Sequence, residues 1–253
     1  MVVILIGSSS SAVDISRDIA AVAKEVHIAS RSVKKDGTLG KLPGYENMWL
    51  HSMIENVHED GTVVFKDGGA VCADVILHCT GYKYYFPFLD TSGIVAVDDN
   101  CVGPLYKRIF PPFLAPGLSF VGLPLKPLFE FQSKWIAGVL SGRLVLPSPE
   151  EMLADVEAFY LILEASGVPK RYTHNIADYQ FKYDDWLAAE CGCPPVEEWR
   201  KEMYLEASKN KLIRPETFRD EWDDHHLVLR AHEHFGKHLS NGDLGEIIPQ
   251  YLQ

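Results

Sequence analysis

The sequence predicts an α/β fold that begins with a parallel β-sheet, and three observations support this prediction. Residues 2–6 are consecutive apolar residues, which is the pattern of a strand buried on both faces of a parallel sheet. A glycine follows, and the next apolar residues recur at helical spacing. Short apolar runs separated by Asp-Gly turns then follow before residue 80. The chain has 253 residues, of which 47% are hydrophobic, so it can bury one large core or two smaller ones.

The first strand, turn and helix match the pattern of a dinucleotide-binding turn. The Rossmann motif G-x-G-x-x-G/A falls on Gly7, Ser9 and Ala12. Gly7 permits the tight turn, and Ala12 is small enough for the helix to lie close to the strand, whereas Ser9 replaces the usual second glycine. We expect the hydroxyl groups of Ser9, Ser10 and Ser11, together with the amides of the helix N-terminus, to bind a phosphate group. The alternative is a serine-rich N-cap of an ordinary strand–helix unit.

The end of the second strand indicates which dinucleotide the turn would bind. Val26–Ala29 is predicted to be a strand and is followed by Ser30 and Arg31. NAD sites usually have Asp or Glu at this position, where the carboxylate accepts a hydrogen bond from the ribose 2′-hydroxyl, whereas a guanidinium suits a 2′-phosphate. Ser30 and Arg31 therefore favour NADP over NAD. The alternative is that Arg31 is a solvated turn residue with no ligand.

The segment after the second strand predicts antiparallel hairpins and then a return to the parallel sheet. Asp60-Gly61 and Asp67-Gly68-Gly69 are hairpin signals on either side of a predicted strand at Val63–Phe65. Val75–Cys79 is a further apolar strand, and Thr80-Gly81 ends it. A parallel strand, a small antiparallel meander and a return strand that ends in Thr-Gly resemble the pyridine-nucleotide domain of flavoproteins with two dinucleotide-binding domains.

Four segments of the chain resemble flavin-containing monooxygenases. CTGYKYYFPFL at residues 79–89 is similar to the A-T-G-Y-x-x-x-F-P-F-L motif of that family. Residues 103–124, 129–143 and 218–235 also resemble the family, and the best match is the plant branch that S-oxygenates glucosinolate side chains. The resemblance covers essentially the whole chain.

This resemblance implies a fold and an activity. Residues 1–82 would form an NADP-binding Rossmann-type domain, and residues 83–253 would form the C-terminal part of a split FAD-binding domain with a helical tail. In the family, NADPH reduces FAD, and the reduced flavin with O2 transfers one oxygen atom to a small-molecule sulfide or amine. Few side chains act as acids or bases in this family, because the cofactors carry the chemistry, and the resemblance identifies no catalytic residue in this chain. The implied cofactor-binding residues are Gly7, Ser9, Ser10, Ser11, Ala12, Ser30 and Arg31 for NADP, Thr80 and Gly81 near the junction of FAD and NADP, and Gly122 and Gln132 near the flavin.

The chain departs from the family pattern because two FAD-domain motifs are absent. These are the fingerprint G-x-G-x-x-G after an N-terminal strand and the signature F-x-G-x-x-x-H. We therefore interpret the chain as the C-terminal part of such an enzyme. A strand predicted at Leu118–Val121 would pair with a sheet that the missing part contributes, and its edge would otherwise be exposed. The sequence thus predicts poor solubility of the chain alone, or association with a chain that supplies the missing half of the FAD domain.

Two functions remain open from the sequence. One is a truncated flavin-dependent monooxygenase, which requires FAD binding without the first fingerprint. The other is a catalytically inactive NADP-binding fragment that associates with full-length relatives. A pyridine-nucleotide disulfide reductase is a third interpretation, but it needs a redox cysteine pair, and Cys191-Gly192-Cys193 lacks the C-x-x-C spacing.

Composition and charge disfavour several classes of partner. The formal net charge of −11 disfavours binding to nucleic acid or to an anionic membrane surface. The longest apolar run near the start covers residues 2–6, which is too short for a membrane span or a signal peptide. The five cysteines show no disulfide-framework spacing, so we expect a reducing compartment, the cytoplasm.

The C-terminal half is predicted to be helical. Ser148, Pro149 and Glu151 form a strong helix start with a capping box, and the helix is expected to cover residues 148–167. Further helices are predicted at residues 176–190, 196–210 and 215–238. Histidines gather in the last of these, and we expect surface residues rather than a metal site there, although two of them have helical spacing. The group comprises His225, His226, His232, His234 and His238.

Overall fold

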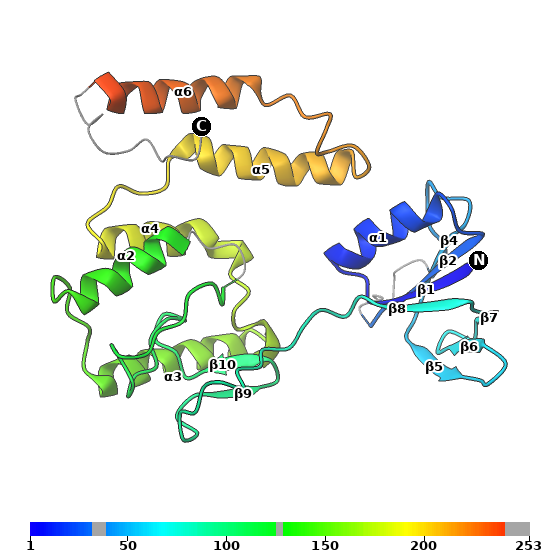
Figure 1. The fold of residues 1–253 in the computed structure, drawn as a ribbon, viewed down its shortest axis with the longest axis horizontal. Helices are drawn as coiled ribbons and strands as arrows, with labels where there is room; N and C mark the ends of the chain where they lie inside the picture. The colour runs from blue at the N-terminus through cyan, green and yellow to red at the C-terminus, as the bar shows by residue number, and fades with distance from the viewer. Residues whose placement is uncertain (32–38, 125–128, 241–253) are drawn as a thin grey trace. The chain divides into compact units, whose positions relative to one another are not determined.

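The computed structural model describes residues 1–31, 39–124 and 129–240, although the side chains of residues 178 and 237–240 lie outside that description. The chain divides into two compact units, Met1–Lys83 and Tyr84–Gln253 (Figure 1). The first unit is an α/β sandwich, and the second is mainly helical with one small β-hairpin. The predicted α/β class is confirmed, with parallel and antiparallel pairing in the first unit.

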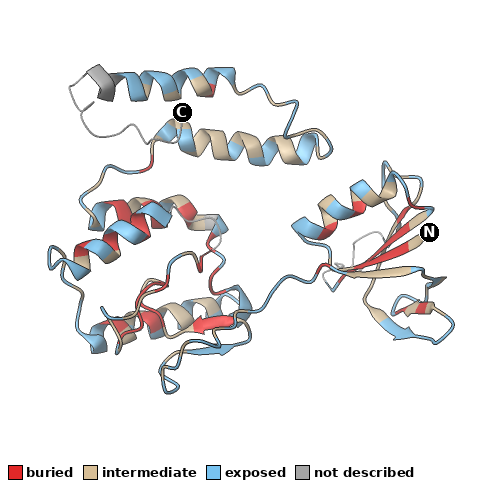
Figure 2. Ribbon diagram, viewed as in Figure 1, coloured by how far each residue is buried: buried red, intermediate tan, exposed pale blue. Residues whose placement is uncertain are grey.

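A mostly parallel sheet forms the centre of the first unit. Its strand order is β3-β4-β2-β1-β8, and β1, β2, β4 and β8 run parallel. The strands are β1 (Val2–Ile6), β2 (Glu25–Ala29), β3 (Gly40–Lys41), β4 (Met48–His51) and β8 (Val75–His78). The central position of β1, between β2 and β8, explains its continuous apolar sequence, since both of its faces are covered (Figure 2).

Different elements cover the two faces of this sheet. Helix α1 (Ser10–Ala20) packs on one face, where Val3 and Leu5 of β1 are buried with Ala12. Ile4 points to the other face, where it packs with Val63 under a three-stranded antiparallel meander. The meander consists of β5 (Ile54–Val57), β6 (Thr62–Phe65) and β7 (Ala70–Cys72). Its two turns contain Gly61 and Gly68 at φ +87° and +89°, so both predicted hairpins are confirmed.

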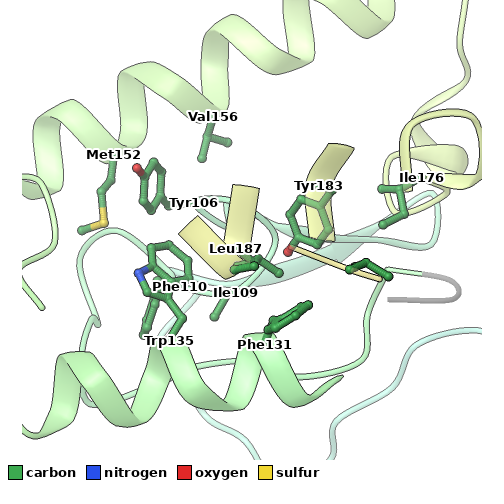
Figure 3. Close-up of a cluster of buried hydrophobic side chains, with 12 residues drawn as sticks. Tyr106, Ile109, Phe110, Phe131, Trp135, Met152, Val156, Ile176, Tyr183 and Leu187 are labelled. Atoms are coloured by element: carbon green, nitrogen blue, oxygen red, sulfur yellow. The ribbon is translucent and has the colours of Figure 1, made fainter. Parts of the chain in front are cut away.

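Helices and ordered loops build the second unit. Its elements are β9 (Ala96–Asp98), β10 (Cys101–Gly103), α2 (Phe129–Leu140), α3 (Pro149–Ala165), the short 3-10 helices Lys170–Tyr172 and Ala177–Tyr179, α4 (Gln180–Glu190), α5 (Glu198–Ile213) and α6 (His225–Ser240). The main core lies between α2, α3 and α4, where Trp135, Met152 and Leu187 meet (Figure 3). The predicted capping box is confirmed, because the Ser148 hydroxyl accepts from the Glu151 amide at 3.2 Å and the Glu151 carboxylate accepts from the Ser148 amide at 2.9 Å.

Two predicted elements differ from the structure. Leu118–Val121 is not a strand: the Phe120 amide donates to the Ile109 carbonyl at 2.8 Å, but no described strand runs beside the segment, and a strand needs a partner. The last helix begins at His225 rather than at residue 215. Its predicted first turns are replaced by separate turns, in which side chains of Asn210 and Arg214 donate to backbone carbonyls of the 218–221 segment.

Candidate functional site

The turn between β1 and α1 requires a glycine at position 7. Gly7 has φ +113°, and a Cβ atom there would lie 2.4 Å from the carbonyl oxygen of Cys79. The Gly7 amide donates to the Ala29 carbonyl at 2.8 Å, and the Cys79 amide donates to the Ile6 carbonyl at 2.8 Å. The turn is therefore held between the carboxyl ends of β2 and β8, which is where ligands bind in open parallel sheets.

The serines that follow Gly7 face solvent at the start of α1. Ser9 is the N-cap residue, but its hydroxyl does not cap the helix. Ser9, Ser10 and Ser11 are exposed, whereas Ala12 is fully buried against the sheet. The first amides of a helix have no partner within the helix and carry its positive dipole end. The exposed hydroxyl groups and these amides therefore offer hydrogen-bond donors to a phosphate group at the start of α1.

The end of β2 lies beside the same turn. The Ser30 side chain is buried, its hydroxyl oxygen is 2.6 Å from that of Ser8, and its amide donates to the His51 carbonyl at 3.0 Å. Arg31 follows directly and is exposed. The structure therefore brings Gly7, Ser8 and Ser30 together, with Ser30 buried and its hydroxyl bonded to that of Ser8.

Thr80 and Gly81 also lie beside the first turn. Both are exposed and follow the end of β8. The Thr80 amide nitrogen is 3.5 Å from the place that a Cβ on Gly7 would occupy. Gly81 has φ +80°, and a Cβ added there would have nothing within 4 Å. The positive φ angle, rather than close packing, therefore favours glycine at this position.

The remaining two candidate residues meet in the second unit. Gln132 lies in the first turns of α2 and is fully buried. Its side-chain oxygen accepts from the Gly122 amide at 2.9 Å, and its side-chain nitrogen donates to the Tyr183 hydroxyl at 3.1 Å. Tyr183 in turn donates to the Lys107 carbonyl at 2.8 Å, and burial raises the pKa of its hydroxyl to about 12. Gln132 thus holds the Gly122 backbone, which turns at φ +85°.

Sequence reasoning did not find Tyr183 as the partner of Gln132. The two residues are 51 positions apart, and the pairing depends on how α4 packs against α2. A local pattern carries no signal for such a contact. The only pointer in the sequence is that a buried glutamine needs partners for both of its amide atoms.

A second polar group missed by the sequence lies on the meander-covered face of the sheet. His27 Nδ1 is 3.0 Å from His51 Nε2, and His51 Nδ1 is 3.3 Å from an Asp67 carboxylate oxygen. Burial lowers the pKa of His27, which favours its neutral form. The Asp67 carboxylate also accepts from the amides of Ser52 and Gly69, which ties the β6–β7 turn to the end of β4. This group lies beside β2, and Ser30 follows the carboxyl end of that strand.

The cysteines and C-terminal histidines form no site in the described part of the chain. All five cysteines are free thiols, and burial raises the pKa of Cys191. His234 Nε2 lies 3.6 Å from a Glu197 carboxylate oxygen, whereas the side chain of His238 is outside the described residues. Within residues 1–31, 39–124 and 129–240, no three His, Cys, Asp or Glu side chains gather as metal ligands. Among the same residues, no helix is long and apolar enough to cross a membrane.

The residues of the chain fit the phosphates of a dinucleotide better than they fit a flavin. The Gly7 turn offers a glycine cradle, exposed hydroxyl groups and a helix N-terminus. For a flavin, the described residues of the second unit contribute the Gly122 backbone, but the Gln132 side chain beneath it is fully buried and bonded within the protein.

Comparisons with known proteins show relatives along almost the whole chain. The sequence profile of the flavin-binding monooxygenase-like family matches residues 42–197. The chain is 62% identical over 238 residues to flavin-containing monooxygenase FMO GS-OX-like 5 of Arabidopsis thaliana, covering 92% of this chain and 53% of that protein. It is 57% identical to FMO GS-OX5 of the same plant, covering 92% and 52%.

A solved structure is also similar. The S-allyl-L-cysteine S-oxygenase from Allium sativum shares 66% sequence identity with the chain and superposes with a TM-score of 0.85, covering 93% of this chain and 54% of that one. The chain thus spans about half the length of the relatives it matches. With a profile match over residues 42–197 and this degree of identity, the chain belongs to the flavin-binding monooxygenase-like family.

Proposed function

We propose that the chain is the NADP-binding and C-terminal portion of an NADPH- and O2-dependent flavin monooxygenase that oxygenates thioether sulfur or amine nitrogen in small molecules. Residues 1–82 are the NADP-binding domain, and residues 83–253 are the C-terminal part of the FAD domain with a helical tail. The observation that carries the proposal is the Gly7 turn, where a Cβ would collide with Cys79 and exposed serines occupy the start of α1, in a chain of a flavin-binding family.

The candidate residues of the first unit each have a specific role in this proposal. The Gly7 turn and the hydroxyl groups of residues 9–11 bind the pyrophosphate, while Ala12 lets α1 approach the sheet. Arg31 pairs with the 2′-phosphate, and Ser30 positions Arg31 through its bond to Ser8. Thr80 and Gly81 lie where nicotinamide and flavin meet. When bound, the flavin supplies the oxygen-transfer chemistry, and the protein orients it and excludes water.

A flavin also needs a cradle for its pyrophosphate, and residues 1–253 contain no G-x-G-x-x-G fingerprint that would supply one. We propose that a chain carrying the N-terminal half of the FAD domain associates with the second unit. Support comes from large apolar side chains that are exposed in the sequence segments on either side of Gly122. These are Phe113, Val121 and Phe129, which are 53%, 48% and 56% exposed. The cysteines, all free thiols, suit a cytoplasmic location.

Thioethers are the proposed substrate class because of the relatives. The garlic relative is named for oxygenation of the sulfur of S-allyl-L-cysteine, and this chain is 66% identical to it. A thioether sulfur is a soft, polarizable nucleophile, so it suits an electrophilic oxygen donor.

A second candidate function rests on the buried Gln132. Because this amide is bonded to Gly122 and Tyr183, it adds no hydrogen bond to a flavin in the arrangement described. The alternative is therefore a catalytically inactive, NADP-binding fragment that associates with full-length relatives.

The visible absorption spectrum of the purified chain, after incubation with FAD and desalting, separates the two candidates. Retained flavin bands, followed by NADPH oxidation that depends on an added thioether, would support the monooxygenase. A colourless protein that still binds NADPH, measured by quenching of tryptophan fluorescence, would support the NADP-binding fragment. A protein that binds neither nucleotide would contradict both.

A further inference from the structure

A cavity in the second unit lies outside the candidate cofactor site. It has a volume of about 230 Å³ and opens between the loop at residues 105–108 and helix α3. Three charged side chains, Lys107, Arg108 and Asp155, line it together with an apolar wall. Neither Gly122 nor Gln132 is among the lining residues. The cavity is therefore distinct from the residues assigned to the flavin.

A buried cation forms part of the lining. Arg108 is 7% exposed, its Nε donates to the Thr173 carbonyl at 3.4 Å, and a terminal nitrogen donates to the Tyr179 hydroxyl. The guanidinium carbon lies 4.3 Å from the centre of the Phe159 ring. No described carboxylate forms an ion pair with Arg108. Burying a cation without an anion is costly, so an anion in the cavity would be strongly stabilised.

The charge of Arg108 also lowers the pKa of a neighbouring histidine, His174. The pKa of His174 falls from its ordinary value of 6.5 to about 4, first because the ring is buried and second because the Arg108 charge is close. His174 is therefore neutral at physiological pH and does not compete with Arg108 for an anion.

The hydrogen-bonding capacity of Arg108 fits a planar anion. A guanidinium has five N–H donors in a rigid fork, and only two bonds from Arg108 to other residues are described. Such a fork matches the two oxygens of a carboxylate. Because Arg108 lines the cavity, its remaining donors can be satisfied by a ligand there.

The rest of the lining defines the size and polarity of the ligand. Lys107 Nζ is 2.6 Å from an Asp155 carboxylate oxygen, so these two charges compensate each other and leave one net positive charge. The apolar wall is made of Leu105, Val156, Ala158, Phe159 and Ile162. One positive charge beside an apolar wall suits one negative charge on a short hydrocarbon body.

We propose that this cavity binds a small aliphatic monocarboxylate, with the carboxylate on Arg108 and the hydrocarbon chain against Val156, Phe159 and Ile162. Inorganic phosphate fits less well, because it would bury polar oxygens against the apolar wall without hydrogen-bond partners.

Calorimetric titration of the full chain at pH 7 tests this proposal with three probes: pentanoate, its neutral isostere pentanamide, and inorganic phosphate. We expect pentanoate to bind and both other probes to bind at least tenfold more weakly. Equal affinity for pentanamide would overturn the role of Arg108. Equal affinity for phosphate would overturn the role of the apolar wall, and absence of pentanoate binding would overturn the site.

Variants separate the site from general effects on folding. Arg108→Gln removes the cation, and Ala158→Trp fills the cavity from the exposed side of α3 while keeping Arg108. We expect each to weaken pentanoate binding at least tenfold. Arg171→Gln is the matched control, because Arg171 is an exposed arginine paired with Asp99 at 3.1 Å, and we expect unchanged binding. If Arg108→Gln does not fold, as judged by circular dichroism, the test rests on Ala158→Trp. Unchanged affinity of the folded Ala158→Trp variant for pentanoate would overturn the proposal.

Discussion

The hydroxyl oxygens of Ser8 and Ser30 lie 2.6 Å apart, and this hydrogen bond joins the turn after β1 to the end of β2. The two strands are adjacent and parallel, with Ile6 opposite Ala29. The exposed serines of α1 and the exposed Arg31 therefore leave the sheet at the same edge. A dinucleotide that places its pyrophosphate on these serines and its 2′-phosphate on Arg31 needs this arrangement.

Replacement of Arg31 tests the choice of nucleotide. Arg31→Ala should weaken NADPH binding by about 2 kcal/mol, or roughly 30-fold, because a charge-assisted pair with the 2′-phosphate is lost. NADH lacks that phosphate, so its affinity should not change. Fluorescence titration with both nucleotides measures the difference, and Lys66→Ala, an exposed cation in the meander, is the control. Equal weakening of both nucleotides, or of neither, would reject Arg31 as the 2′-phosphate ligand.

Two glycines with the same backbone angle allow a test of the turn. Gly7 and Gly40 both have φ +113°, but a Cβ on Gly7 would lie 2.4 Å from a backbone oxygen, whereas one on Gly40 would have nothing within 4 Å. Gly7→Ala should therefore lower the free energy of unfolding by about 3 kcal/mol or more. Gly40→Ala should lower it by about 1 kcal/mol, because only the cost of the positive φ angle applies there. Urea unfolding followed by circular dichroism measures both. A similar loss in the two variants would mean that the close contact with Cys79 is relieved by small shifts.

The first unit was predictable because its signals are local. A run of apolar residues, a glycine and helical spacing define β1, its turn and α1, and Asp-Gly pairs define the hairpins. Each of these patterns depends only on residues a few positions apart. The sequence also indicated that Gly7 permits the tight turn, and its φ of +113° agrees with this.

The second unit was less predictable because its geometry depends on distant partners. The apolar segment Leu118–Val121 has the composition of a strand, but β-structure forms only beside another strand, and none is described there. The bonds from Gln132 to Gly122 and Tyr183, and the position of Arg108 beside Phe159, depend on helix packing over tens of residues. Buried polar residues mark such places, but the sequence does not identify their partners.

The buried bridge at Gln132 makes a prediction about stability. Gln132→Met keeps the size of the side chain but leaves the Gly122 amide and the Tyr183 hydroxyl without that partner, so we expect a loss of about 2 kcal/mol in the free energy of unfolding. Tyr183→Phe should cost a similar amount, because the Lys107 carbonyl loses its donor. The double variant should cost less than the sum, since the two residues share a bond. Urea unfolding measures the cycle, and strict additivity would show that the bond contributes nothing.

The buried His174 makes a prediction about pH. Its Nε2 accepts from the Val102 amide at 3.0 Å, and its Nδ1 is buried without a partner in the described part of the chain, so only the neutral ring suits the folded state. With a folded pKa of about 4 and an ordinary value of 6.5, the unfolded chain takes up a proton first as pH falls. The stabilisation is therefore complete above pH 6.5 and is lost between pH 6.5 and 4, by at most about 1.4 kcal/mol per pH unit. Proton NMR titration of the His174 ring measures its pKa directly, and His174→Gln, which keeps an acceptor for Val102, assigns the signal and should lack this dependence. A His174 ring that titrates near 6.5 in the folded protein would contradict both the burial and the influence of Arg108.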